Sequence, residues 1–188
     1  MIRLMQLAFG FALILLVTSC GLPREIRVDE MQAPDLGLIY GQVRLPDPDW
    51  DLNLIMIQRV GKTYFGVGLQ SLGEEIQITS DGRYVVPNLK PGKYMLSGII
   101  IGRNRNLLGK AALNYTVEVK PGGVHYMGVY DYKIVDGGDV FRYGTFELEA
   151  DRSKATKAKL LVWVEEATRG TRWHGGVQKM LGGKPGGK

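Results

Sequence analysis

The chain has 188 residues, of which 45% are hydrophobic and 23% are charged. This length fits one domain with short appendages, and it is sufficient to bury a core. The sequence holds one cysteine, which excludes an intrachain disulfide, so stability has to come from packing.

The positive charge is concentrated at the C-terminal end. Residues 20–151 hold 14 Lys and Arg against 17 Asp and Glu, whereas residues 152–188 hold nine against two. A basic segment of this kind indicates either an anionic neighbour, such as lipid headgroups or an acidic polymer, or a solvated end that keeps the protein soluble. We expect no nucleic acid partner.

The N-terminal segment resembles a bacterial lipoprotein signal. Arg3 precedes an uncharged run over residues 4–17, and Val17-Thr18-Ser19-Cys20 resembles the lipobox. A helix of about 14 residues spans roughly 20 Å, which is short of the ~30 Å hydrocarbon core, so the run predicts a signal segment rather than a membrane span. The alternative is a buried free thiol at Cys20.

The lipobox resemblance implies where the protein resides. Residues 1–19 would be a removed signal peptide, Cys20 would carry lipid that attaches the protein to a membrane, and residues 20–35 would form a tether. Gly21 stands where an aspartate typically retains lipoproteins at the inner membrane. The expected location is therefore the cell envelope, at the outer membrane facing the periplasm.

From residue 36 the apolar residues alternate with a period of two. In LGLIYGQVRL, Ile39 and Val43 share one face, and Tyr40 and Arg44 share the other. About nine short strands separated by Gly, Pro, Asn and Asp predict a mostly antiparallel β-sandwich over residues 36–149. After the first strand, the others are expected at residues 54–60, 63–68, 75–79, 83–86, 93–101, 113–119, 125–134 and 140–148.

Residues 80–98, SDGRYVVPNLKPGKYMLSG, resemble the carboxypeptidase regulatory-like (transthyretin-like, prealbumin-like) domain. The hallmark is a strand, a short loop ending in Pro-Gly, and a second strand that opens with Tyr. The resemblance covers residues 36–135 and implies a transthyretin-like sandwich of about seven to nine strands, with Leu89 and Tyr94 in its core. Such domains are mostly accessory modules rather than enzymes.

The pattern changes near residue 150, where a helical extension over residues 150–181 is expected. The helix would begin after Asp151 or Ser153 and end before Gly170, although the apolar run LLVWV also fits a buried strand. The basic end, GGKPGGK at residues 182–188, is expected to be disordered, and deletion of residues 169–188 is expected to leave the thermal melt almost unchanged. The residues expected to face the core are Ala155, Ala158, Leu161 and Val162.

Three acids, Asp47, Asp49 and Asp51, have the first, third and fifth positions of a calcium loop. An EF-hand also needs glycine at the sixth position and glutamate at the twelfth, where this chain has Leu52 and Gln58. The loop is therefore either a looser calcium site or a solvated connection between strands. We expect no other metal site and no cofactor.

Aromatic residues are concentrated near residues 125–144. On an exposed sheet face they would stack on sugars or contact a protein partner, whereas inside the sheet they would pack across neighbouring strands. The candidate binding residues are Tyr126, Tyr130, Tyr132, Phe141 and Tyr143.

The sequence contains no recognisable catalytic arrangement. His125 and His174 follow no shared pattern, and no Gly-x-Ser-x-Gly motif is present. We therefore expect a non-catalytic binding or accessory module at the cell envelope, with an envelope protein or a glycan as its partner. The alternative is an envelope hydrolase that uses the dispersed carboxylates of the body.

Overall fold

The computed structural model describes residues 28–47, 50, 52–61, 74–102, 104–136 and 145–182. Several predicted features lie outside these residues: Cys20, the strand at residues 63–68, Asp49, Asp51, Phe141, Tyr143 and the end of the basic tail.

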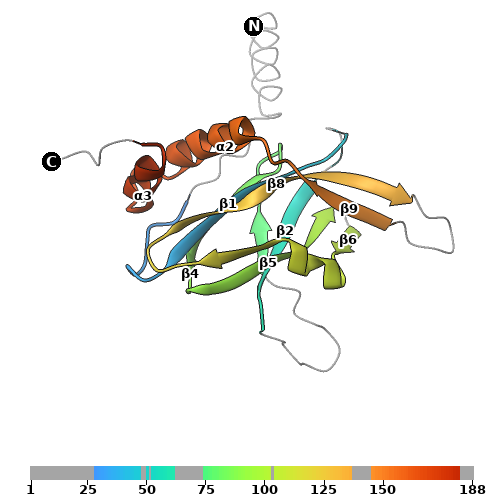
Figure 1. Cartoon of the computed structure of the whole chain (residues 1–188), viewed down its shortest axis with the longest axis horizontal. Coiled ribbons are helices and arrows are strands. Elements are labelled where there is room, and N and C mark those ends of the chain that lie inside the picture. Colours follow the sequence, from blue (N-terminus) through green and yellow to red (C-terminus); the bar gives the residue numbers. More distant parts are fainter. Residues whose placement is uncertain are drawn as a thin grey trace, which may run out of the picture.

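The described chain is mostly strand and forms two sheets with helices at its C-terminal end, so the predicted fold class is confirmed. Figure 1 shows the two sheets stacked on each other and the helices on one side of the stack. Every described strand pair is antiparallel except the pair of β1 and β8, which is parallel. The first sheet has the order β4 (Arg83–Leu89), β1 (Gly37–Arg44), β8 (Val124–Asp136) and β9 (Thr145–Ala150); the second has the order β3 (Glu74–Gln77), β2 (Leu52–Arg59), β5 (Gly92–Ile101) and β6 (Asn104–Leu107), with β7 (Thr116–Val119) also paired to β5.

The main core lies between the two sheets. Ile39 and Val43 are fully buried there, as the period of two predicts. Leu89 and Tyr94, which the motif at residues 80–98 places in the core, are 8% and 7% exposed. The Tyr94 hydroxyl also donates a hydrogen bond of 2.9 Å to the Lys90 carbonyl, which ties the strand to the loop before it.

Two strand predictions need correction in the second sheet. β6 forms at Asn104–Leu107, where a turn was expected. Arg105 and Leu107 are exposed, and β6 joins the sheet through backbone pairing with β5. The sequence of β6 therefore lacks the alternation of apolar and polar residues that would predict a strand. The strand expected at residues 113–119 begins only at Thr116, because Gly109–Asn114 forms the short 3-10 helix η2.

Two helices, α2 (Lys154–Ala167) and α3 (Trp173–Met180), form a helical layer over the outer face of the first sheet (Figure 1). The predicted helix is thus confirmed over the alternative strand, and Ser153 caps it by accepting a hydrogen bond from the Thr156 backbone N–H. A second core forms beneath this layer. It contains Leu38, Tyr40, Val85 and Val129 from the sheet, and Leu160, Leu161, Val164, Trp173 and Val177 from the helices.

The predicted core face of α2 is wrong for three of its four residues. Leu161 is buried, but Ala155, Ala158 and Val162 are exposed. The helix turns its larger apolar side chains, Leu160, Leu161 and Val164, toward the sheet, since these remove more apolar surface from water than alanines do.

Both ends of the described chain pack into the helical layer. Trp173 is 1% exposed and Val177 is fully buried, so the expectation that residues 169–188 bury little is wrong. Val28 is also buried in the second core, and the Glu30 carboxylate accepts a hydrogen bond of 3.0 Å from the Arg172 backbone N–H. Residues 28–35 of the expected tether therefore pack against the domain, and residues 20–27 are not among the residues that the structure describes.

We expect Trp173→Ala to lower the free energy of unfolding by about 3–5 kcal/mol, because it leaves a cavity between α3 and the sheet. Met180→Ala on the same helix is the control; that side chain is 42% exposed, and its loss is expected to change stability by about 0.5 kcal/mol or less. Urea unfolding measures both variants. Equal, small effects would mean that α3 does not contribute to the folded core.

Candidate functional site

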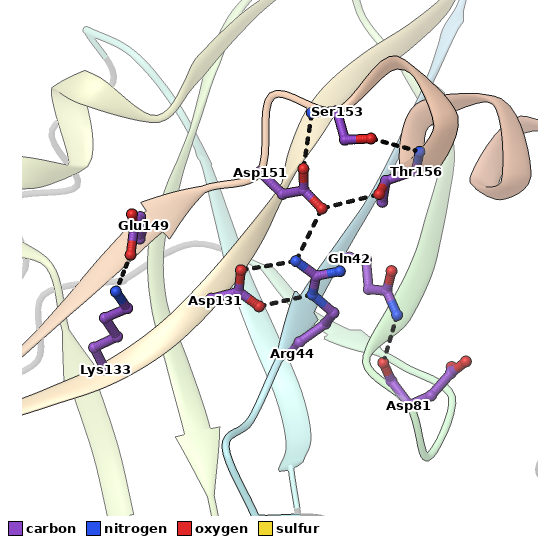
Figure 2. A network of polar contacts seen from close by, with 9 residues as sticks. All are labelled: Gln42, Arg44, Asp81, Asp131, Lys133, Glu149, Asp151, Ser153 and Thr156. Atoms are coloured by element: carbon purple, nitrogen blue, oxygen red, sulfur yellow. Dashed lines mark hydrogen bonds and ion pairs between the residues drawn. The ribbon is translucent and has the colours of Figure 1, made fainter.

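Arg44, the last residue of β1, forms the centre of a polar network in the first sheet (Figure 2). Arg44 Nε and Nη2 donate hydrogen bonds of 2.7 Å each to the two carboxylate oxygens of Asp131. Asp131 lies beside Arg44 in the register of the parallel β1–β8 pair. Two parallel hydrogen bonds to one carboxylate fix the orientation of the guanidinium group.

Asp151 connects this arginine to the start of α2. Its carboxylate accepts a hydrogen bond of 3.0 Å from Arg44, one of 2.8 Å from the Ser153 backbone N–H, and one of 2.9 Å from the Thr156 hydroxyl. The hydrogen bonds from Ser153 and Thr156, followed by the Arg44 contact, lower the pKa of Asp151. The hydrogen bond to Asp131 is the largest cause of the raised pKa of Arg44. Both groups are therefore ionised at neutral pH.

A third carboxylate, that of Asp81, is fixed in the turn between β3 and β4. Asp81 accepts hydrogen bonds from the Thr79 hydroxyl at 2.5 Å and from Arg83 Nε at 2.9 Å. Burial alone would raise the pKa of Asp81, but the hydrogen bonds from Arg83 and Thr79 and the charge of Arg83 lower it overall. Gly82 has a φ of 79°, and a Cβ at this position would overlap the Val43 carbonyl, so the turn requires glycine.

The turn and the network meet at Gln42, whose side-chain amide donates a hydrogen bond of 2.9 Å to the Asp81 carbonyl. Two open depressions lie here. The Trp50 depression, of about 470 Å³, is lined by Gln42, Arg44, Leu45, Asp47, Trp50 and Asp81 among others. The Lys159 depression, of about 340 Å³, is lined by Gln42, Arg44, Asp81, Arg83, Thr156, Lys159 and Leu160.

The aromatic residues of β8 do not form the exposed face that was a candidate for binding. Tyr130 and Tyr132 are 6% and 8% exposed and belong to the main core. Tyr126 is half-buried on the other face, with its ring 5.5 Å from that of Tyr40 and with the Lys157 ammonium 4.9 Å away. β8 lies inside the sheet and is covered on both faces, so its rings pack instead of meeting solvent.

Trp50 is an aromatic side chain that lines one of these depressions, and it was not among the candidate binding residues. It is half-buried, and its ring packs edge-on against Tyr132 with the centroids 6.1 Å apart. The sequence feature that could have indicated Trp50 is its position in the acidic loop, between Asp49 and Asp51, which are candidate calcium ligands.

The acidic loop is only partly described. Asp47 lies in the Trp50 depression, while Asp49 and Asp51 are outside the described residues. Within the residues that the structure does describe, no group of three His, Cys, Asp or Glu side chains is placed to hold a metal ion. The two histidines make local contacts: His125 Nε2 accepts a hydrogen bond from the Lys120 backbone N–H, and His174 Nε2 lies 3.3 Å from the Glu165 carboxylate.

None of the helices in the described ranges has the length and apolar character needed to cross a membrane. Comparisons with family models, with curated proteins and with solved structures find no match for this chain.

We expect Arg44→Gln to lower the free energy of unfolding by about 1 kcal/mol at neutral pH, because it leaves Asp131 and Asp151 without their shared cation. Urea unfolding at several pH values measures the effect. The pKa of Asp151 is lower in the folded protein than in the unfolded chain, so its contribution is complete above about pH 4 and is lost as the pH falls through the folded value. The difference between variant and wild type should therefore shrink in acid.

Lys133→Gln is the matched control, because it also removes a cation from a pair across strands. Lys133 pairs with Glu149, but both side chains are largely exposed to solvent, so we expect a smaller change in stability than for Arg44→Gln. If both substitutions have the same small effect at every pH, the Arg44 network does not stabilise the fold.

Proposed function

We propose that the protein is a lipid-anchored protein of the cell envelope that acts as a non-catalytic binding or accessory module and binds its ligand in the Trp50 depression. The proposed location is the outer membrane on the periplasmic side, with the lipid on Cys20. The lipobox-like residues before Cys20 support the anchor and the location, and the geometry around Arg44 and Trp50 supports the binding role.

The observation on which the binding role depends is that arginines already pair with three carboxylates that line the two depressions or lie beside them. Asp131 and Asp151 pair with Arg44, and Asp81 pairs with Arg83. A hydrolase of the two-carboxylate type needs one group that is held protonated near neutral pH. The lowered pKa values of Asp81 and Asp151 favour the opposite state, which supports binding over the alternative of an envelope hydrolase.

The chemistry of the Trp50 depression favours a glycan as the partner. An aromatic ring offers an apolar face for stacking, and the neighbouring Gln42 amide and Asp81 carboxylate provide a donor and acceptors for hydroxyl groups. The depression is open, which fits an extended polymer better than a small molecule that has to be enclosed. An envelope protein as the partner is the second candidate.

We expect soluble peptidoglycan fragments to bind the wild-type protein, and Trp50→Ala to weaken that binding about tenfold or more, since stacking on a ring is worth roughly 1–3 kcal/mol. Isothermal titration calorimetry measures the affinity. Leu113→Ala is the control, because it also removes an exposed apolar side chain, at 57% exposure, from η2 on the second sheet. Equal affinity of the Trp50→Ala and Leu113→Ala variants would show that Trp50 does not contribute to binding. Cleavage of the peptidoglycan fragments into shorter ones would support the hydrolase alternative.

We expect Cys20 to carry the membrane anchor. Wild-type protein in cells should incorporate labelled palmitate and partition into detergent, because two or three acyl chains bind a bilayer firmly at roughly 0.8 kcal/mol per buried CH₂. Cys20→Ser should lose both properties. A Cys20→Ser protein that stays in the membrane with an intact N-terminus would contradict the lipid anchor.

A further inference from the structure

The helix α2 has apolar residues on two opposite sides. Its inner side, with Leu160, Leu161 and Val164, packs on the first sheet. Its outer side bears Ala155, Ala158 and Val162, which are all exposed and which share one face because a helix turns about 100° per residue. We call these three residues the outer stripe. A helix that is apolar on both sides is typical of one that is covered on both sides.

Two lysines flank the outer stripe. At about 100° per residue, Lys154 and Lys159 lie on either side of it, and both side chains are exposed. Residues 152–182 together hold seven Lys and Arg against two Glu. Of these two acids, Glu165 is near His174 and Arg169, which leaves Glu166 as the acid closest to the stripe. This surface is complementary in charge to an anionic one.

The start of the described chain lies at the same helical layer. Val28 is buried with Trp173 and Val177 in the second core, and Glu30 contacts Arg172 between α2 and α3. Seven residues lie between Cys20 and Val28, which makes eight steps along the chain, and at 3.3–3.6 Å per step the connection spans about 29 Å at most. If Cys20 carries lipid, as the proposed function states, this short connection keeps the helical layer close to the membrane surface.

We propose that the outer face of α2 rests on an anionic phospholipid leaflet. The outer stripe enters the headgroup region, and Lys154 and Lys159 contact lipid phosphates. The small side chains of Ala155 and Ala158 permit a close approach, and Val162, at 57% exposure, contributes most of the exposed apolar surface. The second sheet then faces away from the membrane.

The test places a polarity-sensitive fluorophore on each side of the molecule. Cys20→Ser removes the single cysteine and the lipid, so Val162→Cys and Leu113→Cys in this full-length background can each be labelled at one position. Val162 and Leu113 are both 57% exposed, which makes them a matched pair on opposite sides of the sandwich. The probes are vesicles of phosphatidylglycerol with phosphatidylcholine, and vesicles of phosphatidylcholine alone.

At low salt we expect the Val162 label to shift to shorter wavelengths with phosphatidylglycerol vesicles only, and the Leu113 label to remain unchanged. Physiological salt should reverse most of the shift, because the Debye length is then about 8 Å. Lys154→Glu with Lys159→Glu should weaken vesicle binding roughly tenfold or more. The control, Lys93→Glu with Lys110→Glu in and beside the second sheet, should leave it unchanged.

Three results would overturn the proposal: no shift of the Val162 label with any vesicle, an equal shift of the Leu113 label, or a Val162 shift that grows with protein concentration without vesicles. The last would show that a second copy of the chain covers the stripe. These vesicle measurements use protein without lipid, so they do not depend on the anchor. If Cys20 incorporates palmitate but the Val162 label does not shift, the membrane contact of α2 is rejected and the lipid anchor stands. If the Val162 label shifts but Cys20 incorporates no palmitate, the lipid anchor is rejected and the membrane contact of α2 stands.

Discussion

The whole structure depends on one constraint, which is that the first sheet is apolar on both faces. On β1, Ile39 and Val43 point into the main core, and Leu38 and Tyr40 point to the opposite side, yet all four are fully buried. A sheet of this kind needs a cover on each side, as in a three-layer arrangement. The second sheet provides one cover, and α2, α3 and the segment at Val28 provide the other. The helical extension is therefore an integral part of the fold.

The Arg44 network determines where this outer cover begins. Arg44 holds Asp131 on the neighbouring strand and Asp151 at the end of β9, and Asp151 in turn binds Ser153 and Thr156 at the first turn of α2. The same interactions lower the pKa of Asp151 and occupy both carboxylates with hydrogen bonds. This pairing of acids with arginines is one reason why we propose recognition rather than proton transfer for this site.

Much of the sandwich could be predicted because its inner face follows simple patterns. Leu89 and Tyr94 are buried as the motif at residues 80–98 implies. The outer face could not be predicted as reliably. Tyr40 shares its face of the strand with Gln42 and Arg44 and so resembles a solvent-facing position, and only the helices that cover it make it part of a core. In α2, the run LLVWV offers apolar residues in several directions, so the pattern does not determine which side meets the sheet.

The candidate site was harder to predict than the fold, because its contacts connect distant parts of the sequence. Arg44 and Asp131 are 87 residues apart, and nothing local to either residue indicates the other. The aromatic residues of β8 are concentrated in the sequence and so predict a binding face, although β8 is an inner strand whose rings are covered, whereas Trp50 is a single aromatic residue in a loop. The lipid on Cys20 stays a prediction, since that residue lies outside the described part of the chain.

The parallel pairing of β1 with β8 has a consequence for how the chain reaches its native state. β1 is among the first segments to be synthesised, but its parallel partner β8 is made only after most of the domain. The contact between Glu30 and Arg172 likewise joins residues that are 142 positions apart. Proteins dominated by such distant contacts have high contact order and fold slowly, because the entropy of closing long loops is lost before the contacts form. The apolar residues on the outer face of β1 therefore remain without their full cover until the C-terminal helices have been made. A binding partner that protects this strand during synthesis or transport would meet the chain at its most aggregation-prone stage.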